Sequence, residues 1–156
     1  MMDQLQKTRI RIGIIGSRRR DTAKDKEATR VVLLDLLKEL PGNSEITIVS
    51  GGCRVYKKSK NSYVLCGGDR FAEEFAEEYG YEKDIFLPDW KDIDPSKPRK
   101  WEAARVLLAR NTPIANTVDY LIACVAEDRK GGTEDTIKKF NRRKLDPSRL
   151  RLVPLE

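Results

Sequence analysis

The sequence contains no histidine, and this absence excludes several common kinds of catalytic and metal-binding site. Without histidine there is no Ser-His-Asp triad, no Cys-His pair and no histidine ligand for a metal. The three cysteines are too few for a four-cysteine zinc site, and their odd number argues against a full disulfide framework. We therefore expect no metal and no cofactor. Any chemistry must use carboxylates, Arg, Lys, Ser, Thr, Tyr or backbone amides.

Long apolar runs are also missing. No run approaches the ~20 residues that cross a bilayer, and the first twelve residues lack the apolar region of a signal peptide. We expect a cytoplasmic protein that does not bind membranes, folded as one domain over residues 1–156. The 31 Lys and Arg outnumber the 25 Asp and Glu, which gives a net charge of +6. This charge favours anionic partners without distinguishing a nucleotide from a nucleic acid.

Short apolar runs alternate with amphipathic segments, a pattern typical of a parallel sheet covered by helices. The apolar runs predict strands at residues 9–15, 45–50, 84–87, 119–126 and 150–155. Helical spacing predicts helices at residues 22–40, 71–79, 101–112 and from 131 past 140. The third helix should end before Pro113, and the run at 119–126 should be a central strand buried on both faces. The expected fold is α/β, a Rossmann-like three-layer sandwich with a mainly parallel, five-stranded sheet.

Three turns that follow predicted strands carry glycine, and in such a fold they all lie at the ligand-binding edge of the sheet. Glycine lets backbone N–H groups approach a phosphate, and the helix that follows adds free donors and partial positive charge. A tight turn alone would explain any one of these glycines, but three turns on one edge favour a shared phosphate site. The glycines are Gly16, the pairs Gly51-Gly52 and Gly67-Gly68, and Gly131-Gly132.

The turns do not match the common nucleotide fingerprints. Gly13-Ile14-Ile15-Gly16 is not G-x-G-x-x-G, and the second strand ends in Ser50 rather than in the acid that binds an NAD ribose. No G-x-x-x-x-G-K-[ST] motif occurs. An ordinary dehydrogenase and a P-loop NTPase are therefore disfavoured.

The sequence resembles the SLOG superfamily in a succession of motifs from about Arg9 to Phe140: GIIGSRRR, IVSGG, GGDRFAEEFAEEYG, FLPDW, ARN with DYLIA, and GGTEDTI. This superfamily includes the lonely-guy cytokinin-activating phosphoribohydrolases, the DNA-processing protein A domain and small nucleotide-sensing domains. The resemblance implies a Rossmann-like sheet, a nucleotide or phosphate site built from these turns, and a homodimer. It matches Gly16 and Ser17 to the first phosphate-facing loop, Gly68-Asp69-Arg70 to G-x-D-R, Arg110 to an arginine before the apolar strand, and Gly132-Thr133 to a late G-T.

The sequence departs from that family at the position of a catalytic glutamate. The phosphoribohydrolases carry G-G-x-G-T-x-x-E, and Thr136 stands here at the glutamate position. The nearby acids Glu134 and Asp135 either favour the helix dipole or assist cleavage at a sugar. Asp69 has the same two interpretations, as a helix cap or as an acceptor for a ribose hydroxyl.

A second departure is an insertion at residues 53–66, CRVYKKSKNSYVLC. Its cations and tyrosines would suit base stacking along a phosphate backbone, and its position would suit a lid. The alternative is a solvent-exposed hairpin or mobile loop. Cys53 and Cys66 flank the insertion, either as a disulfide or as the reduced thiols expected in the cytoplasm, whereas Cys124 should be core. The cations and tyrosines are Lys57, Lys58, Lys60, Tyr56 and Tyr63.

Three functions remain open at this point. The first is binding of a nucleotide or nucleotide-derived phosphate, with a possible role as a sensor. The second is hydrolysis of a nucleoside 5′-monophosphate at its N-glycosidic bond, with Glu134 and Arg110 as catalytic residues. The third is single-stranded nucleic-acid binding through residues 53–66. The predicted ligand-binding residues are Gly16, Ser17, Arg18, Gly51, Gly52, Gly68, Asp69, Arg70, Arg110, Asn111, Gly131, Gly132 and Thr133.

Overall fold

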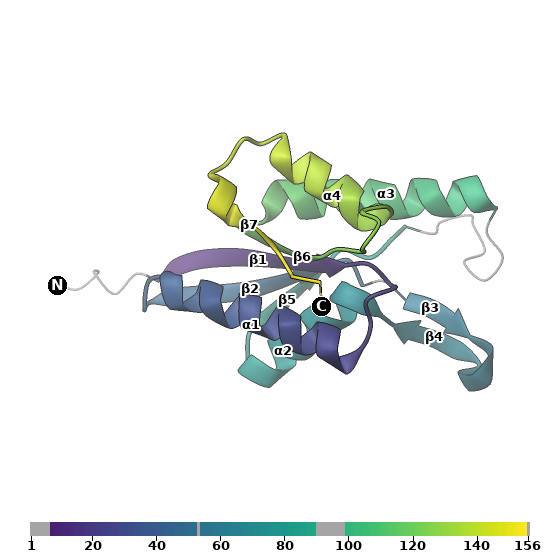
Figure 1. Ribbon diagram of the computed structural model, residues 1–156, viewed down its shortest axis with the longest axis horizontal. Coiled ribbons are helices and arrows are strands. Elements are labelled where there is room, and N and C mark those ends of the chain that lie inside the picture. Colours follow the sequence, from purple (N-terminus) through teal and green to yellow (C-terminus); the bar gives the residue numbers. More distant parts are fainter. Residues whose placement is uncertain (1–6, 53, 90–98, 156) are drawn as a thin grey trace.

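A single sheet of five parallel strands forms the centre of the molecule (Figure 1). The computed structural model describes residues 7–52, 54–89 and 99–155. Its strand order is β5-β2-β1-β6-β7, so the chain builds outward from β1 first on one side and then on the other. The strands are β1 (Thr8–Gly16), β2 (Ser44–Ser50), β5 (Glu82–Ile85), β6 (Tyr120–Cys124) and β7 (Leu150–Leu152).

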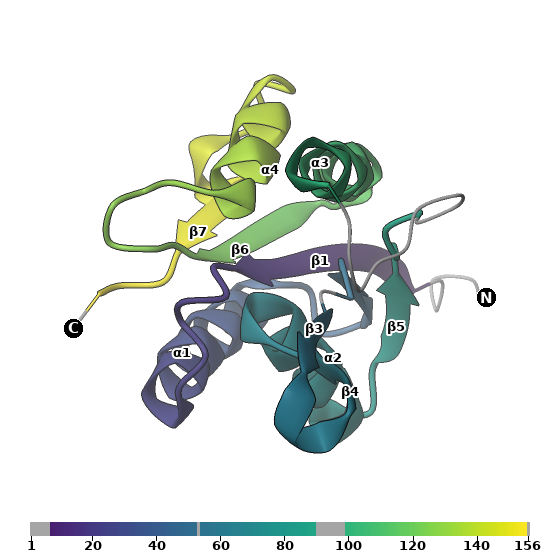
Figure 2. The ribbon, with the colours of Figure 1, turned by 90° about the vertical axis from the view of Figure 1, so that its right-hand side faces the viewer.

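Two helices cover each face of this sheet (Figures 1 and 2). The helices α1 (Ala23–Glu39) and α2 (Gly67–Tyr79) lie on one face, and α3 (Lys100–Thr117) and α4 (Gly132–Asn141) lie on the other. Each face has its own core, which includes Leu33 and Phe71 on the first side and Ile114 and Phe140 on the second. The predicted Rossmann-like α/β sandwich is confirmed.

Local capping chemistry sets the start of α1 and the end of α2, whereas α2 begins at Gly67, four residues before the predicted start. Thr22 begins α1 with a capping box, because its hydroxyl accepts from Asp25 N at 3.1 Å and its own N–H donates to the Asp25 carboxylate at 3.3 Å. Gly80 ends α2 in the left-handed conformation, with φ of 71°. The chain is buried from Leu121 in β6 to Ala126, as expected for a central strand whose two faces are both covered by helices.

The prediction that the third helix ends before Pro113 is wrong. The helix α3 continues to Thr117 with Pro113 inside it. A proline inside a helix costs about 3 kcal/mol, but the last turn of α3 buries Ile114 and Ala115 completely against the sheet. Burial of these side chains offsets the lost backbone hydrogen bond. Tertiary packing thus overrides the local signal.

The described residues of the insertion form a separate two-stranded β-hairpin that is not paired with the main sheet (Figure 1). The strands β3 (Arg54–Lys57) and β4 (Ser62–Leu65) run antiparallel, with Tyr56 opposite Tyr63, and the 3₁₀ turn Lys58–Lys60 joins them. Cys53 lies outside the described residues, whereas Cys66 and Cys124 are both buried. A second 3₁₀ turn, Pro147–Arg149, leads into β7. Within the described ranges, none of the helices combines the length and apolar character that a bilayer crossing requires.

Candidate functional site

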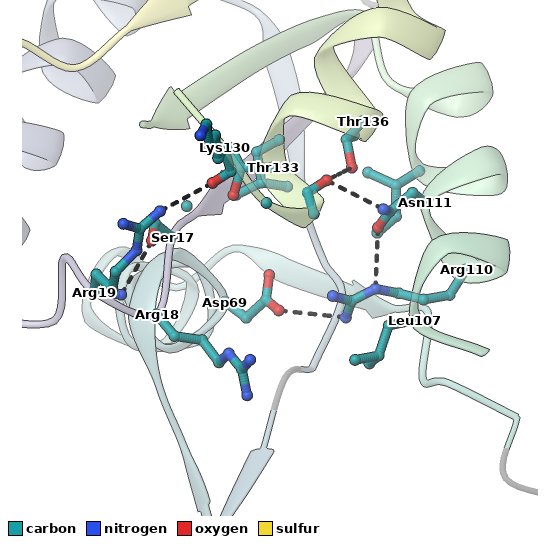
Figure 3. A pocket seen from close by; sticks show the side chains of 15 residues that line it. Ser17, Arg18, Arg19, Asp69, Leu107, Arg110, Asn111, Lys130, Thr133 and Thr136 are labelled. Atoms are coloured by element: carbon teal, nitrogen blue, oxygen red, sulfur yellow. Dashed lines mark hydrogen bonds and ion pairs between the residues drawn. The ribbon is translucent and has the colours of Figure 1, made fainter. Parts of the chain in front are cut away.

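A cavity of about 280 Å³ opens at the carboxyl ends of β1 and β6 (Figure 3). The chain leaves β1 toward α1 on one face of the sheet and leaves β6 toward α4 on the other. Neighbouring parallel strands whose connections diverge in this way form a crevice, the usual ligand site of open α/β sheets. Nine of the predicted ligand-binding residues line it, namely Gly16, Ser17, Arg18, Asp69, Arg110, Asn111, Gly131, Gly132 and Thr133.

The amino terminus of α4 supplies backbone donors to this cavity. Gly131 precedes the helix with φ of 118°, a conformation that favours glycine. Glu134 N turns back to Gly131 O at 3.2 Å, whereas in the described part of the chain the amides of Gly132 and Thr133 have no protein acceptor. Two free N–H groups at the positive end of a helix form a favourable place for an anion.

The other glycine turns do not offer their amides in the same way, which corrects the prediction that all three share an anion. Gly51 N donates to the Asp69 carboxylate at 3.2 Å, and Gly52 N donates to the Ser50 hydroxyl at 3.0 Å. Ser17 N donates to Cys124 O at 3.0 Å. The structure assigns these three amides to the scaffold, so they are not available to an anion.

Gly68 is a packing residue outside the cavity lining. A Cβ added to it would lie 2.2 Å from both Gly16 N and the carbonyl carbon of Ile15. The first turn of α2 therefore touches the end of β1 directly, which only glycine permits. This contact carries the neighbouring Asp69 to the cavity, where its side chain is 7% exposed.

Arg110 reaches into the site from α3 and meets Asp69, which comes from α2 (Figure 3). Its Nη1 lies 3.3 Å from the Asp69 carboxylate and also donates to Gly51 O, and its Nε donates to Asn111 Oδ1 at 3.2 Å. A Cβ on Gly51 would lie 2.1 Å from Nη1, so Gly51 provides the space that the guanidinium occupies. The Nη2 group of Arg110 has no acceptor among the described residues and remains available to a ligand.

Four cations line the cavity, and two of them lack a carboxylate partner in the described ranges. Arg19 forms two hydrogen bonds with Asp128, at 2.8 and 2.9 Å, and these hold the pKa of Asp128 at about 2. Arg110 is paired with Asp69. Arg18 and Lys130 have no such ion pair among the described residues, so a ligand here meets uncompensated positive charge.

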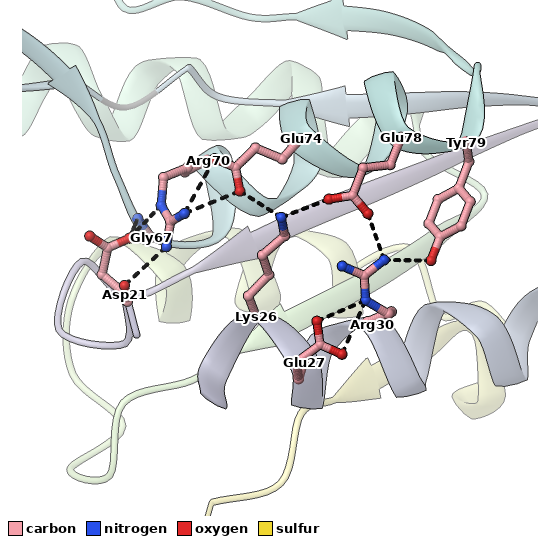
Figure 4. A network of polar contacts seen from close by, with 9 residues as sticks. All are labelled: Asp21, Lys26, Glu27, Arg30, Gly67, Arg70, Glu74, Glu78 and Tyr79. Atoms are coloured by element: carbon pink, nitrogen blue, oxygen red, sulfur yellow. Dashed lines mark hydrogen bonds and ion pairs between the residues drawn. The ribbon is translucent and has the colours of Figure 1, made fainter. Parts of the chain in front are cut away.

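The structure does not bring Arg70 into the cavity. Its guanidinium donates to Asp21 at 3.0 Å and to Glu74 at 3.1 Å, within a polar network between α1 and α2 (Figure 4). Asp21 also accepts from Gly67 N at 2.7 Å, so it caps α2 from a distant loop. Arg70 therefore stabilises the packing of the two helices, and the predicted ligand contact is not observed.

Glu134, the predicted catalytic acid, also lies outside the cavity lining. Its carboxylate pairs with Arg129 at 2.7 and 2.9 Å, at the start of α4. Thr136 lines the cavity and is 2% exposed, and its hydroxyl lies 3.4 Å from Gly132 O. Among the described lining residues, Asp69 is the one carboxylate. Within the same ranges, no group of three His, Cys, Asp or Glu residues is placed to hold a metal ion.

The sequence analysis missed six lining residues, which are Ile15, Arg19, Leu107, Ile114, Lys130 and Thr136. Leu107 and Ile114 lie three residues before and four residues after Arg110, on one face of α3. This spacing would have indicated them, but the predicted helix stopped before Ile114. Because the predicted helix ended before Pro113, the sequence analysis did not identify Ile114 as a residue of the site.

Comparisons with known proteins leave the family of this chain open. No family model and no curated protein matches the sequence. Among solved structures, the U34-tRNA thiolase NcsA from Methanococcus maripaludis, with its 4Fe-4S cluster, is similar at 15% sequence identity and a TM-score of 0.37. The match covers 97% of this chain and 53% of that one, so this chain spans about half the length of the thiolase. Similarity at this level carries no argument about function.

Proposed function

We propose that the chain binds a nucleotide or nucleotide-derived phosphate in the cavity between β1 and β6. One observation carries the proposal: the free amides of Gly132 and Thr133 open into the same cavity as Arg18 and Lys130. A helix amino terminus beside uncompensated cations stabilises a phosphate through charge-assisted hydrogen bonds, each about twice as strong as a neutral one. The Nη2 group of Arg110 adds a planar donor suited to phosphate oxygens.

The size of the cavity favours a small ligand. Its volume of about 280 Å³ lies near the lower end of the ~300–1,000 Å³ typical of small-molecule sites. Leu107 and Ile114 add apolar side chains to its lining. The cavity therefore fits the phosphate and the adjoining part of a compact molecule.

Binding without hydrolysis is the form of the proposal that the site supports best. A general acid or base must lie within hydrogen-bond reach of the reacting group. Glu134 is paired with Arg129 outside the lining, and Asp69 is held by Arg110 and by Gly51 N. A hydrolytic reaction would therefore depend on Asp69, and released base in a chromatographic assay that disappears in Asp69→Asn would establish it.

Calorimetric titration with AMP, GMP, CMP, UMP and ribose 5-phosphate tests the proposal. We expect at least one to bind, with an affinity that falls as salt is added. Arg18→Gln should weaken that binding about 10- to 100-fold, since one charged hydrogen bond contributes about 1.5–3 kcal/mol. Lys38→Gln removes the same charge from an exposed position at the far end of α1 and serves as the matched control. No binding by any of the five compounds would refute the proposal.

A further inference from the structure

A second cavity, of about 450 Å³, lies beside the first and shares Arg110 with it. It opens between α3 and the segment that follows β5. Most of its wall is apolar, in contrast to the cationic first cavity. The apolar side chains of this wall are Phe86, Leu87, Val106, Ala109 and Pro113; the charged residues Asp89 and Arg105 also line it, with Arg110 at the boundary.

The two cavities use adjacent faces of α3. Leu107, Asn111 and Ile114 face the first cavity, and the residues that face the second, Val106 and Pro113, each precede one of them by one position. Successive helical residues are rotated by about 100°, so the two sets form neighbouring stripes. Arg110 lies on the border and belongs to both.

The order of the strands places the two cavities along one line. The first lies over β1 and β6, and the second lies beside β5, at the edge of the sheet. Between them is β2, and Arg110 donates to Gly51 O directly after this strand ends. Phe86 N donates to Ser50 O at 2.8 Å, which fixes the start of the apolar wall against the same strand. A ligand lying along this edge would cross the pair formed by Arg110 and Asp69.

We infer that the second cavity holds the aromatic base of a nucleoside phosphate whose phosphate lies at the amino terminus of α4. This inference rests on the proposed function and narrows its ligand class. A mostly apolar cavity that adjoins a cationic one at Arg110 suits a molecule with a charged end and a flat apolar end, which inorganic phosphate and ribose 5-phosphate lack. The sugar hydroxyls lie over Asp69 and Arg110, where the carboxylate and guanidinium offer an acceptor and a donor.

A variant that fills the second cavity distinguishes binding of the base from binding of the phosphate. Ala109 is an exposed residue of α3 that lines this cavity, so Ala109→Phe occupies the space without disturbing the core. Ala104 is exposed on the same helix and lines neither cavity, so Ala104→Phe is the matched control. Calorimetry compares ribose 5-phosphate with AMP, GMP, CMP and UMP in each protein.

In the wild type we expect the best nucleotide to bind at least tenfold more tightly than ribose 5-phosphate, as contact with a base predicts. Ala109→Phe should abolish this margin, which is the ratio of the affinity for the nucleotide to the affinity for ribose 5-phosphate, and should leave the affinity for ribose 5-phosphate unchanged. Ala104→Phe should preserve the margin. Equal affinities in the wild type, or a margin that survives Ala109→Phe, would overturn the inference and leave the phosphate site intact. Failure of all five compounds to bind the wild type would instead refute the proposed function.

A truncation provides a second test should Ala109→Phe fold poorly. Leu87 is 60% exposed and lines the second cavity, so Leu87→Ala should reduce the nucleotide margin several-fold. Val31, which is 57% exposed on α1, gives the control Val31→Ala. Equal margins in both truncation variants and the wild type would count against a base in this cavity.

Discussion

Replacing Gly51 with alanine should disable the site while leaving the fold intact. The added Cβ would lie 2.1 Å from Nη1 and 2.5 Å from Cζ of Arg110, and the nearest atoms all belong to that flexible side chain. Arg110 can therefore move away, at the cost of its bonds to Gly51 O and to Asp69. Losing such charged hydrogen bonds should lower the free energy of unfolding by about 1.5–3 kcal/mol. Ligand affinity should fall about 10- to 100-fold, because Nη2 moves with the guanidinium.

Two measurements on Gly51→Ala separate these effects. Denaturant unfolding reports the change in stability, and calorimetry with the tightest-binding nucleoside monophosphate reports the change in affinity. Gly42→Ala is the matched control, since a Cβ at Gly42 meets nothing within 4 Å. The reasoning would be refuted if Gly51→Ala bound the ligand as tightly as Gly42→Ala does, because Arg110 would then contribute nothing from its observed position.

Three further predictions follow from the contacts of single side chains. Arg18→Gln should flatten the salt dependence of ligand binding and leave the unfolding midpoint unchanged, since Arg18 has no ion pair in the described ranges. Arg70→Gln should lower the unfolding midpoint and leave the salt dependence of binding unchanged, because it breaks the ion pair with Asp21. Hydrogen bonds from Arg30 and Lys26 lower the pKa of Glu78 from about 4.5 to about 2. The ionised carboxylate therefore stabilises the folded state fully at pH values above 4.5, and this stabilisation is lost as the pH falls toward 2. Glu78→Gln should therefore lower the free energy of unfolding at pH 7 by less than about 1 kcal/mol, and denaturant titrations should show this difference vanishing near pH 2. Glu134→Gln should leave nucleotide affinity within twofold of wild type by calorimetry, and a tenfold loss would place its carboxylate in the site after all.

The fold could be predicted because its signals are local. The capping box at Thr22, the apolar run of β6 and the amphipathic pattern of α2 each appear within a few residues of sequence. The exception was Pro113, whose local effect is opposed by burial of Ile114 against a distant strand. That contact depends on tertiary packing, and sequence periodicity alone could not weigh it.

The site was predictable to the extent that it depends on strand ends. Gly16 ends β1, Ser17 follows it and Gly132 begins the helix after β6, so topology alone brings them together. The partners of individual side chains were not predictable, because Arg70 pairs with Asp21 across 49 residues of sequence. The role of Gly51 as space for Arg110 is likewise visible only in three dimensions.

The central claim is that a phosphate binds at the free amides of Gly132 and Thr133 in the first turn of α4. Titration of ¹⁵N-labelled protein with ribose 5-phosphate, followed by NMR, tests it at individual residues. The largest saturable shifts of amide resonances should belong to Gly132 and Thr133, with smaller ones at Ser17 and Arg18. Saturable shifts confined to other parts of the chain, with Gly132 and Thr133 unmoved, would contradict the claim.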